Sequence, residues 1–296
     1  MTAPTSLLTF LTRAGIPYDH WRADGDGPPD PSAPGSAATL PPHRLIVADD
    51  AAMLAGAVDA TVATVPSGPA IGAPTFALAM AGAVPAALEA AAQAVETRSQ
   101  RDRPLAPVSP EVGRLLYLLA RARRARNALE IGAGAGASTL WLAAGLRQPG
   151  GRLVAIDRDS ARRTLALGGL NKAGLTSLVD YRLGVAERLL ARLSGRFDLV
   201  LLDETAEDRE GHLIQLFNGG HLSPRAMIFS HGGQAEASSL SRAHARLQVQ
   251  PTVTATVSLG AGGGLFVAVT AAAPASPGSP GSPASPSTPN RPAASI

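Results

Sequence analysis

From about residue 127 onward, short apolar runs alternate with longer segments of mixed polarity along this 296-residue chain. Short apolar runs bounded by Gly, Asp or Pro are typical of buried strands, and the longer segments between them are typical of helices. The pattern predicts strands at 127–131, 152–156, 178–183, 197–202, 225–230, 250–257 and 264–270. It predicts helices at 138–146, 159–172, 185–193, about 207–218 and about 234–247.

Strands that alternate with helices predict an α/β fold with a mostly parallel, doubly wound sheet, here of seven strands. A short glycine-rich link, residues 259–264, separates the last two predicted strands, so we expect them to pair as an antiparallel C-terminal hairpin. In the N-terminal part the periodicity is weak. It predicts one strand at 44–48 and helices near 5–14 and 84–98.

The first strand of the regular pattern runs directly into a glycine-rich turn and then a helix. Gly132, Gly134 and Gly136 alternate with alanines, and Ser138 stands at the expected start of the helix. Glycines allow a sharp turn at the carboxyl end of a strand and leave no Cβ between the backbone and a ligand, while the following helix presents unpaired N–H groups. The turn therefore predicts a site for a nucleotide-type ligand, although a turn without any ligand is the simpler alternative.

Two acidic residues near this turn help to choose the ligand. Asp157 ends the second strand, at about the distance from the glycines where a carboxylate binds ribose hydroxyls in dinucleotide sites. This residue suits NAD and S-adenosyl-L-methionine equally. Glu130, two residues before Gly132, would repel a pyrophosphate but accepts hydrogen bonds from a cationic amino-acid group. Glu130 and the antiparallel ending favour S-adenosyl-L-methionine over an NAD-type oxidoreductase.

Over about residues 105–270 the chain resembles the catechol and caffeoyl-CoA type O-methyltransferases, methyltransferase family 3, which have the Rossmann-like class I methyltransferase fold. The motifs that carry the resemblance are Ser109-Pro110-Glu111-Val112-Gly113-Arg114-Leu115-Leu116, Leu129-Glu130-Ile131-Gly132 with Gly136-Ala137-Ser138, Ala155-Ile156-Asp157, Gly184-Val185-Ala186, Phe197-Asp198-Leu199-Val200-Leu201-Leu202-Asp203, and Leu259-Gly260 with Gly264-Leu265-Phe266. The glycine motif alone is specific only to the superfamily, and the ordered set points to the family.

The resemblance implies a role for each motif in binding S-adenosyl-L-methionine. Glu130 would contact the methionine end of the cofactor, Ser138 its carboxylate and Asp157 its ribose. The backbone of Gly132, Ala133, Gly134 and Gly136 would form the cradle, and Ala186 would lie near the adenine. Two simpler alternatives stay open, because Ser138 also suits a helix cap and Ala186 also suits a small packing residue.

The residues expected to perform the chemistry differ from those of the family. The family usually binds a divalent cation through an Asp after the fourth strand and an Asp-Asn pair after the fifth, with a Lys three residues beyond the first Asp as base. Here Asp203 matches the first Asp, but the pair is His231-Gly232 and the Lys position is Ala206. Lys172, the only lysine of the chain, lies elsewhere. One carboxylate and one imidazole suit Mg²⁺ poorly, so we expect no metal.

Asp203 and His231 end neighbouring parallel strands, which lie about 4.8 Å apart, so we expect their side chains to meet. An imidazole oriented by a carboxylate can deprotonate a hydroxyl while the sulfonium supplies the electrophile. We therefore predict that Asp203 and His231 are the catalytic residues. In the alternative interpretation, His231 is a loop residue and Asp203 contacts only the amino group of the cofactor.

Composition limits the remaining possibilities. The chain has no cysteine, which excludes disulfides and thiol chemistry, and it opens with no signal peptide, so we expect a cytoplasmic protein without a membrane span. The net charge is only +3, and 4% of the residues are aromatic, too few to suggest base stacking. An arginine-rich run at 121–126 would attract nucleic acid, but a solvated helix end is the simpler interpretation. We expect a small-molecule acceptor, and we leave a homodimer open.

Three regions follow from these patterns. Residues 1–95 form an N-terminal Ala/Pro-rich extension or small cap region, 105–270 the cofactor-binding domain, and 274–296 a disordered Pro/Ser/Gly-rich tail. The predicted function is O-methylation of a small hydroxylated acceptor without a divalent metal. The alternatives are an inactive protein that binds S-adenosylmethionine or S-adenosylhomocysteine, and an RNA methyltransferase.

Overall fold

The computed structural model describes residues 7–21, 40, 44–49, 54, 60–66, 75–102, 108–204, 206–232, 243, 245–259 and 265–273. The tail predicted at 274–296 and most of the helix predicted at 234–247 lie outside these residues. Of that helix, residues 243 and 245–247 are described, and they are helical.

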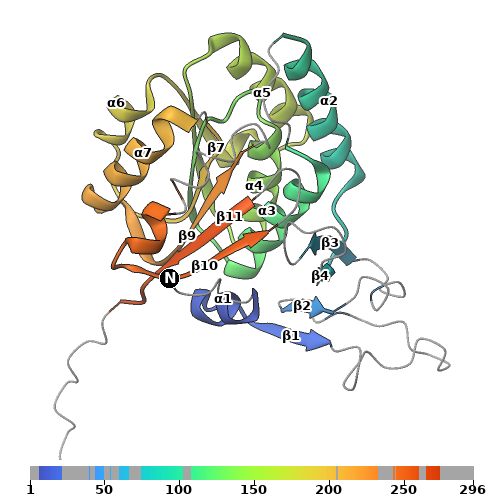
Figure 1. The fold of residues 1–296 in the computed structure, drawn as a ribbon. Coiled ribbons are helices and arrows are strands. Elements are labelled where there is room, and N and C mark those ends of the chain that lie inside the picture. The colour runs from blue at the N-terminus through green and yellow to red at the C-terminus, as the bar shows by residue number, and fades with distance from the viewer. Residues whose placement is uncertain are drawn as a thin grey trace, which may run out of the picture.

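A seven-stranded sheet forms the centre of the molecule (Figure 1). Its order is β10–β11–β9–β8–β5–β6–β7. The strands are β5 (Asn127–Ile131), β6 (Arg152–Asp157), β7 (Val179–Leu183), β8 (Phe197–Leu202), β9 (Leu222–His231), β10 (Val253–Leu259) and β11 (Leu265–Thr270). Strands β5 to β9 are parallel to one another, and β11 is antiparallel to both β9 and β10. The predicted class I methyltransferase sheet and its antiparallel hairpin are confirmed.

Helices cover both faces of this sheet because its central strands are apolar on both sides. Leu199 and Leu201 of β8 face one core, while Val200 and Leu202 face the other. On the first face lie α3 (Pro110–Arg123), α4 (Ala137–Arg147) and α5 (Ser160–Lys172), with α2 (Ala86–Asp102) packed against α4 and α5. On the second face lie α6 (Ala186–Leu190) and α7 (Ala206–Asn218), while a short 3-10 helix, η2 (Thr176–Leu178), leads into β7.

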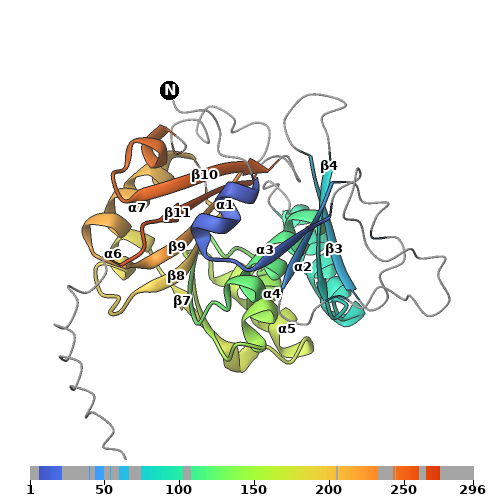
Figure 2. The same cartoon turned by 90° about the horizontal axis from the view of Figure 1, so that it is seen from below.

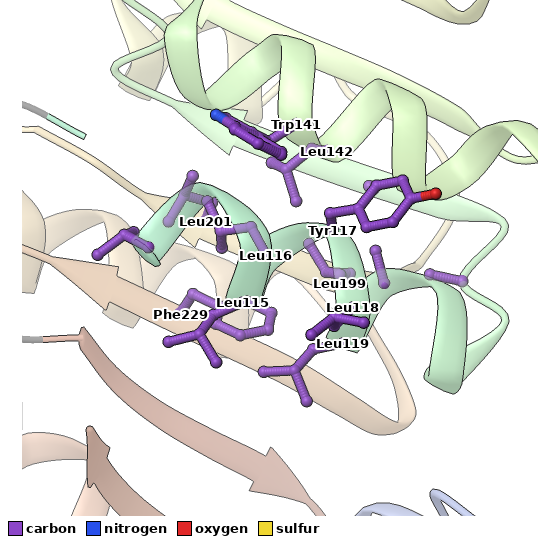
Figure 3. Packing of buried hydrophobic residues seen from close by; sticks show 14 of the residues in the cluster. Leu115, Leu116, Tyr117, Leu118, Leu119, Trp141, Leu142, Leu199, Leu201 and Phe229 are labelled. Carbon is purple, nitrogen blue, oxygen red and sulfur yellow. The ribbon is translucent and has the colours of Figure 1, made fainter. Parts of the chain in front are cut away.

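Helix α3 fixes the layer above the sheet. The Ser109 hydroxyl accepts a hydrogen bond from the Val112 N–H at 3.3 Å, and Pro110 occupies the first turn, as its fixed φ allows. Figure 3 shows the leucines of α3 packed over Leu199, Leu201 and Phe229 of the sheet. Gly113 is required here, because a Cβ at this position would lie 2.2 Å from the Trp141 indole nitrogen. The close contact between α3 and α4 holds the helix that follows the glycine turn.

The described N-terminal residues form a second sheet that shares its core with the first. Its order is β1–β2–β4–β3, with β1 (Tyr18–Trp21), β2 (Leu45–Ala48), β3 (Ala60–Pro66) and β4 (Thr75–Ala81). Helix α1 (Leu7–Ala14) packs on β9, β10 and β11, while β3 and β4 contact α3 (Figure 2). The predicted strand at 44–48 and the helices near 5–14 and 84–98 are confirmed, whereas β1, β3 and β4 were not predicted.

Within the described residues, no helix is both long enough and apolar enough to cross a membrane.

Candidate active site

A cavity of about 450 Å³ opens at the carboxyl ends of the central strands. The turns that follow β5, β6, β7, β8 and β9 all contribute to its wall. This is the edge of a parallel α/β sheet where ligands bind, because the strand ends and the helix N-termini converge there. The predicted site residues on its wall are Gly132, Ala133, Gly134, Ser138, Asp157, Ala186, Asp203 and His231.

The glycine turn has the geometry that the sequence pattern predicts. Gly132, Gly134 and Gly136 adopt φ values of +86°, +53° and +94°, in the left-handed region that side chains disfavour. A Cβ on Gly132 would lie 2.4 Å from the Asp203 carbonyl oxygen, so this glycine lets the turn pass close to the end of β8. Gly136 lies off the cavity wall, since its Cβ position faces Ala166 of α5 at 2.8 Å. Its role is therefore to bring α4 and α5 together.

Ser138 lies on the cavity wall and does not cap the helix. The N-cap of α4 is Gly136, which forms no side-chain cap, and Ser138 is in the first turn with 2% of its surface exposed. The interpretation of Ser138 as a helix cap was therefore wrong. A hydroxyl at a helix N-terminus, facing a cavity, is suited to an anionic group.

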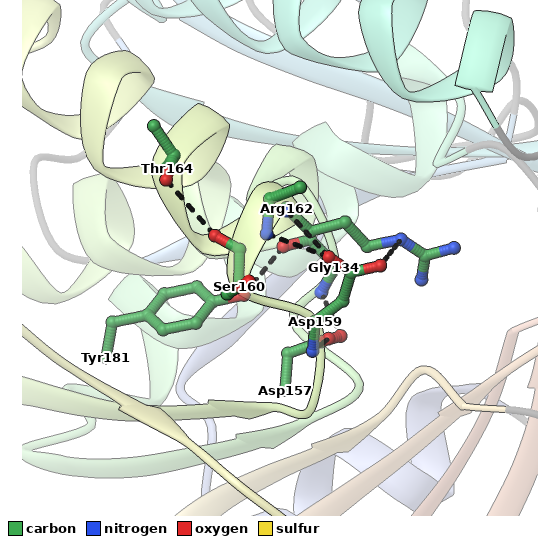
Figure 4. Close-up of polar contacts among 8 residues, drawn as sticks. Gly134, Asp157, Asp159, Ser160, Arg162, Thr164 and Tyr181 are labelled. Carbon is green, nitrogen blue, oxygen red and sulfur yellow. Dashed lines mark hydrogen bonds and ion pairs between the residues drawn. The ribbon is translucent and has the colours of Figure 1, made fainter.

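Asp157 organises the turns on both sides of it (Figure 4). Its Oδ2 accepts a hydrogen bond from the Gly134 N–H and its Oδ1 one from the Asp159 N–H, both at 2.8 Å. Tyr181 of β7 donates to the Gly134 carbonyl oxygen at 2.7 Å, and burial followed by the Asp157 charge raises the pKa of Tyr181. Tyr181 was not predicted as a site residue, since a tyrosine inside a strand gives no such signal. Asp157 is thus held rigidly at the cavity wall.

Glu130 lies behind the glycine turn, with none of its surface exposed. Its Oε2 accepts a hydrogen bond from the Thr139 hydroxyl at 2.7 Å, and its Oε1 is buried without a hydrogen-bond partner among the described residues. Burial raises the pKa of Glu130 to about 7, and the charges of Asp203 and Asp157 add to this, against the hydroxyls of Ser138 and Thr139. A buried carboxylate with an unused oxygen fits a ligand that brings a cationic donor.

Asp203 and His231 meet at the ends of β8 and β9, as their positions predict. The His231 Nδ1 atom lies 2.8 Å from Asp203 Oδ1, and the histidine side chain is 1% exposed. With Nδ1 carrying the proton toward the carboxylate, the neutral ring has its lone pair on Nε2. This is the tautomer that can accept a proton from a hydroxyl.

A second buried histidine, His212, is paired with a carboxylate on the same cavity wall, and the sequence analysis missed it. The Nδ1 atom of His212 on α7 is 2.6 Å from Glu204 Oε1, and its Nε2 is 3.4 Å from Glu187 Oε1 of α6. Burial lowers the pKa of His212, but the two carboxylates outweigh burial and raise it overall. No sequence signal marks His212, because only the fold shows that it is buried beside two carboxylates.

The residues present do not fit the metal site of the resembling family. The Asp203 carboxylate is hydrogen-bonded to His231, the Glu204 carboxylate is hydrogen-bonded to His212, and Gly232 has no side chain that could bind a metal. Mg²⁺ requires several oxygen ligands in octahedral geometry, and no group of three or more His, Cys, Asp or Glu side chains suited to a metal occurs among the described residues.

Two arginines of the arginine-rich run at 121–126 hold helix α3 in the fold. Arg121 donates to the Ala81 carbonyl oxygen at 3.1 Å and lies 5.2 Å from the Tyr117 ring centroid, and Arg123 donates to the carbonyl oxygens of Pro224 and Arg225. These contacts tie α3 to β4 and to the start of β9.

Sheet order, hairpin, glycine turn and strand-end carboxylates together define a class I methyltransferase. A model of the O-methyltransferase family matches residues 86–222. A protein of Mycolicibacterium smegmatis whose name places it among the O-methyltransferases is 34% identical over 176 residues, which cover 55% of this chain and 82% of that protein. The chain belongs to this O-methyltransferase family.

Other relatives match over shorter stretches or in structure. A catechol O-methyltransferase of Niastella koreensis is 37% identical over 114 residues, 37% of this chain and 51% of that protein, so the match spans about half of its length. The O-methyltransferase TomG of Streptomyces achromogenes, solved with SAM, is 29% identical, with a TM-score of 0.53 over 64% of this chain and 91% of that one. Cofactor-bound Rv0187 from MTB is 27% identical, with a TM-score of 0.54 over 62% and 89%.

Proposed function

We propose that this chain transfers the methyl group of S-adenosyl-L-methionine to a hydroxyl of a small-molecule acceptor, with His231 as general base and without a divalent metal. The single observation that carries the proposal is the 2.8 Å contact between His231 Nδ1 and Asp203 Oδ1 at the cavity wall, where the family has metal ligands. In this mechanism Asp203 and His231 replace both the metal and the lysine.

The cofactor fits the residues around the cavity. Glu130 would accept hydrogen bonds from its ammonium group, the backbone of the glycine turn and the Ser138 hydroxyl would hold its carboxylate end, and Asp157 would take the ribose hydroxyls. Ala186 leaves room for the adenine beside Gly184. When bound, the cofactor supplies an electrophilic methyl group on a positively charged sulfur.

The protein then has to position and deprotonate the acceptor. The His231 imidazole takes the hydroxyl proton on Nε2, and the Asp203 carboxylate stabilises the resulting imidazolium through Nδ1. With the cofactor bound, the acceptor oxygen would form its new bond to the methyl carbon, and the electron pair of the broken bond would stay with the leaving sulfur. Burial of His231 keeps bulk water away from this proton transfer.

Substituting Asp157 tests the cofactor site. Asp157→Ala should weaken S-adenosylmethionine binding by about 1.5 to 3 kcal/mol, since it removes a charged acceptor and two hydrogen bonds that hold the turns. Isothermal titration calorimetry measures the change. Asp180→Ala on β7, whose carboxylate pairs with Arg182 on the surface, is the matched control. An unchanged dissociation constant for Asp157→Ala would place Asp157 outside the site.

Chelation tests the metal-free mechanism. Methyl transfer should persist at full rate in EDTA and should not rise when Mg²⁺ is added, because the Asp203 and Glu204 carboxylates are already bonded to histidines. Initial rates measured with radiolabelled cofactor, before and after chelation, give the answer. Activity that disappears with EDTA and returns with Mg²⁺ would overturn this part of the proposal.

A further inference from the structure

Arg209 of α7 is the largest side chain in the described core that is almost fully buried, with 1% of its surface exposed. A buried guanidinium is costly unless its donors are used, so its partners indicate what it does. It donates to the His231 carbonyl oxygen at 2.7 Å and to the Glu204 carbonyl oxygen. One nitrogen atom, Nη2, thus joins the ends of two different strands.

Those two carbonyl groups belong to the segments that carry the proposed catalytic pair. His231 is the last residue of β9, and Glu204 directly follows Asp203 at the end of β8. Strand ends leave carbonyl groups without a ladder partner, and the next residue after His231 is Gly232, which permits many backbone conformations. The guanidinium therefore fixes the backbone at the point from which the imidazole projects toward Asp203.

We propose that Arg209 is a positioning residue for the Asp203–His231 pair, an inference that rests on the proposed function. Arg209 holds the two strand ends at the separation that allows the 2.8 Å contact between Nδ1 and Oδ1. Both hydrogen bonds come from the Nη2 atom at the tip of the side chain, so the ammonium of a lysine, which has a shorter side chain, would not reach both carbonyl groups at hydrogen-bond distance.

Arg123 provides a matched control at the opposite end of the same strand. Its guanidinium donates to the carbonyl oxygens of Arg225 and Pro224, near the start of β9, far along the strand from His231. Arg123→Met therefore removes the same kind of contact from the same strand without touching the cavity.

The experiment compares Arg209→Met, Arg209→Lys and Arg123→Met in the full-length protein. The Nδ1–H proton signal of His231 is recorded by NMR and assigned by its absence in His231→Ala, with the His20 ring bonded to Asp49 as an internal reference. We expect Arg209→Met to lose the His231 signal and at least tenfold in kcat, with the KM of the acceptor and the Kd of the cofactor within threefold. Arg209→Lys should be intermediate, and Arg123→Met should behave as the parent.

The outcomes of this experiment either support or overturn the positioning role of Arg209. A folded Arg209→Met that keeps both the His231 signal and kcat overturns the proposal. If Arg209→Met unfolds, shown by loss of the His20 signal, Arg209→Lys decides, and full kcat with an intact His231 signal in that variant overturns it. If His231→Ala itself leaves turnover unchanged, the general-base mechanism fails, while loss of the His231 signal in the Arg209 variants still supports the positioning role.

Discussion

Replacing His231 with alanine is expected to lower turnover by about 10² to 10⁴ while leaving the affinity for S-adenosylmethionine unchanged. The reason is that the imidazole is the group positioned to take the hydroxyl proton, whereas the expected cofactor contacts come from the turns after β5, β6 and β7. Rates on a panel of phenolic and hydroxylated acceptors, with calorimetry for the cofactor, measure both quantities.

His221→Ala is the control for this experiment. His221 precedes β9 at the opposite end of the strand and is buried like His231, but it lies outside the cavity wall. If His231→Ala matches the parent, transfer relies on proximity to the sulfonium alone. If the parent binds the cofactor but methylates nothing on the panel, RNA included, then the replaced family ligands indicate a binding protein that has lost catalysis.

The central sheet and most of the cavity wall could be predicted because their signals are local. A run of neighbouring apolar residues predicts a strand that is buried on both sides, as Leu199 to Leu202 are. Alternating glycines likewise predict a turn with positive φ values. The approach of His231 to Asp203 followed from strand order, since ends of adjacent parallel strands meet at one edge. The role of Gly136 could not be predicted in this way, because only the position of α5 in the fold shows that this glycine faces another helix and not a ligand.

The N-terminal sheet could not be predicted for a physical reason. Strands β3 and β4 read ATVATVP and TFALAMA, in which alanine gives neither the β-branched enrichment nor the alternation that identifies a strand. These strands pair with each other and pack on α3, and composition does not reveal this long-range packing. Likewise, Arg209 and His212 occur in an ordinary charged helix, and only the fold shows that both are buried. The division of the chain that makes residues 1–95 an extension or small cap region stays a prediction.

Replacing Glu130 with glutamine is expected to stabilise the cofactor-free protein and to weaken cofactor binding. Burial raises the pKa of Glu130 from 4.5 to about 7. Between these two pH values Glu130 is therefore protonated in the folded state and ionised in the unfolded state. Stability from this group is therefore highest below about pH 4.5 and falls as pH rises to about 7, at a total cost of about 3 kcal/mol. Above pH 7, Glu130→Gln should therefore raise the free energy of unfolding of the cofactor-free protein by about 1 to 3 kcal/mol, measured by urea unfolding at pH 8.

Cofactor binding should show the opposite dependence on pH. Only the ionised Glu130 attracts the cofactor ammonium, so the affinity of the parent should fall about 30-fold from pH 8 to pH 5.5, as protonation of a group with a pKa of about 7 requires. Glu130→Gln should bind more weakly at pH 8 and lose this dependence, while Glu111→Gln on α3, outside the cavity wall, should resemble the parent. A Glu130→Gln variant that is more stable but binds the cofactor like the parent would show that Glu130 belongs to the core and not to the cofactor site. If Glu130 is a cofactor ligand, the variant should be more stable and should bind the cofactor more weakly. The reason is that the free-energy cost of burying the ionised carboxylate is offset only when the cofactor ammonium binds to it.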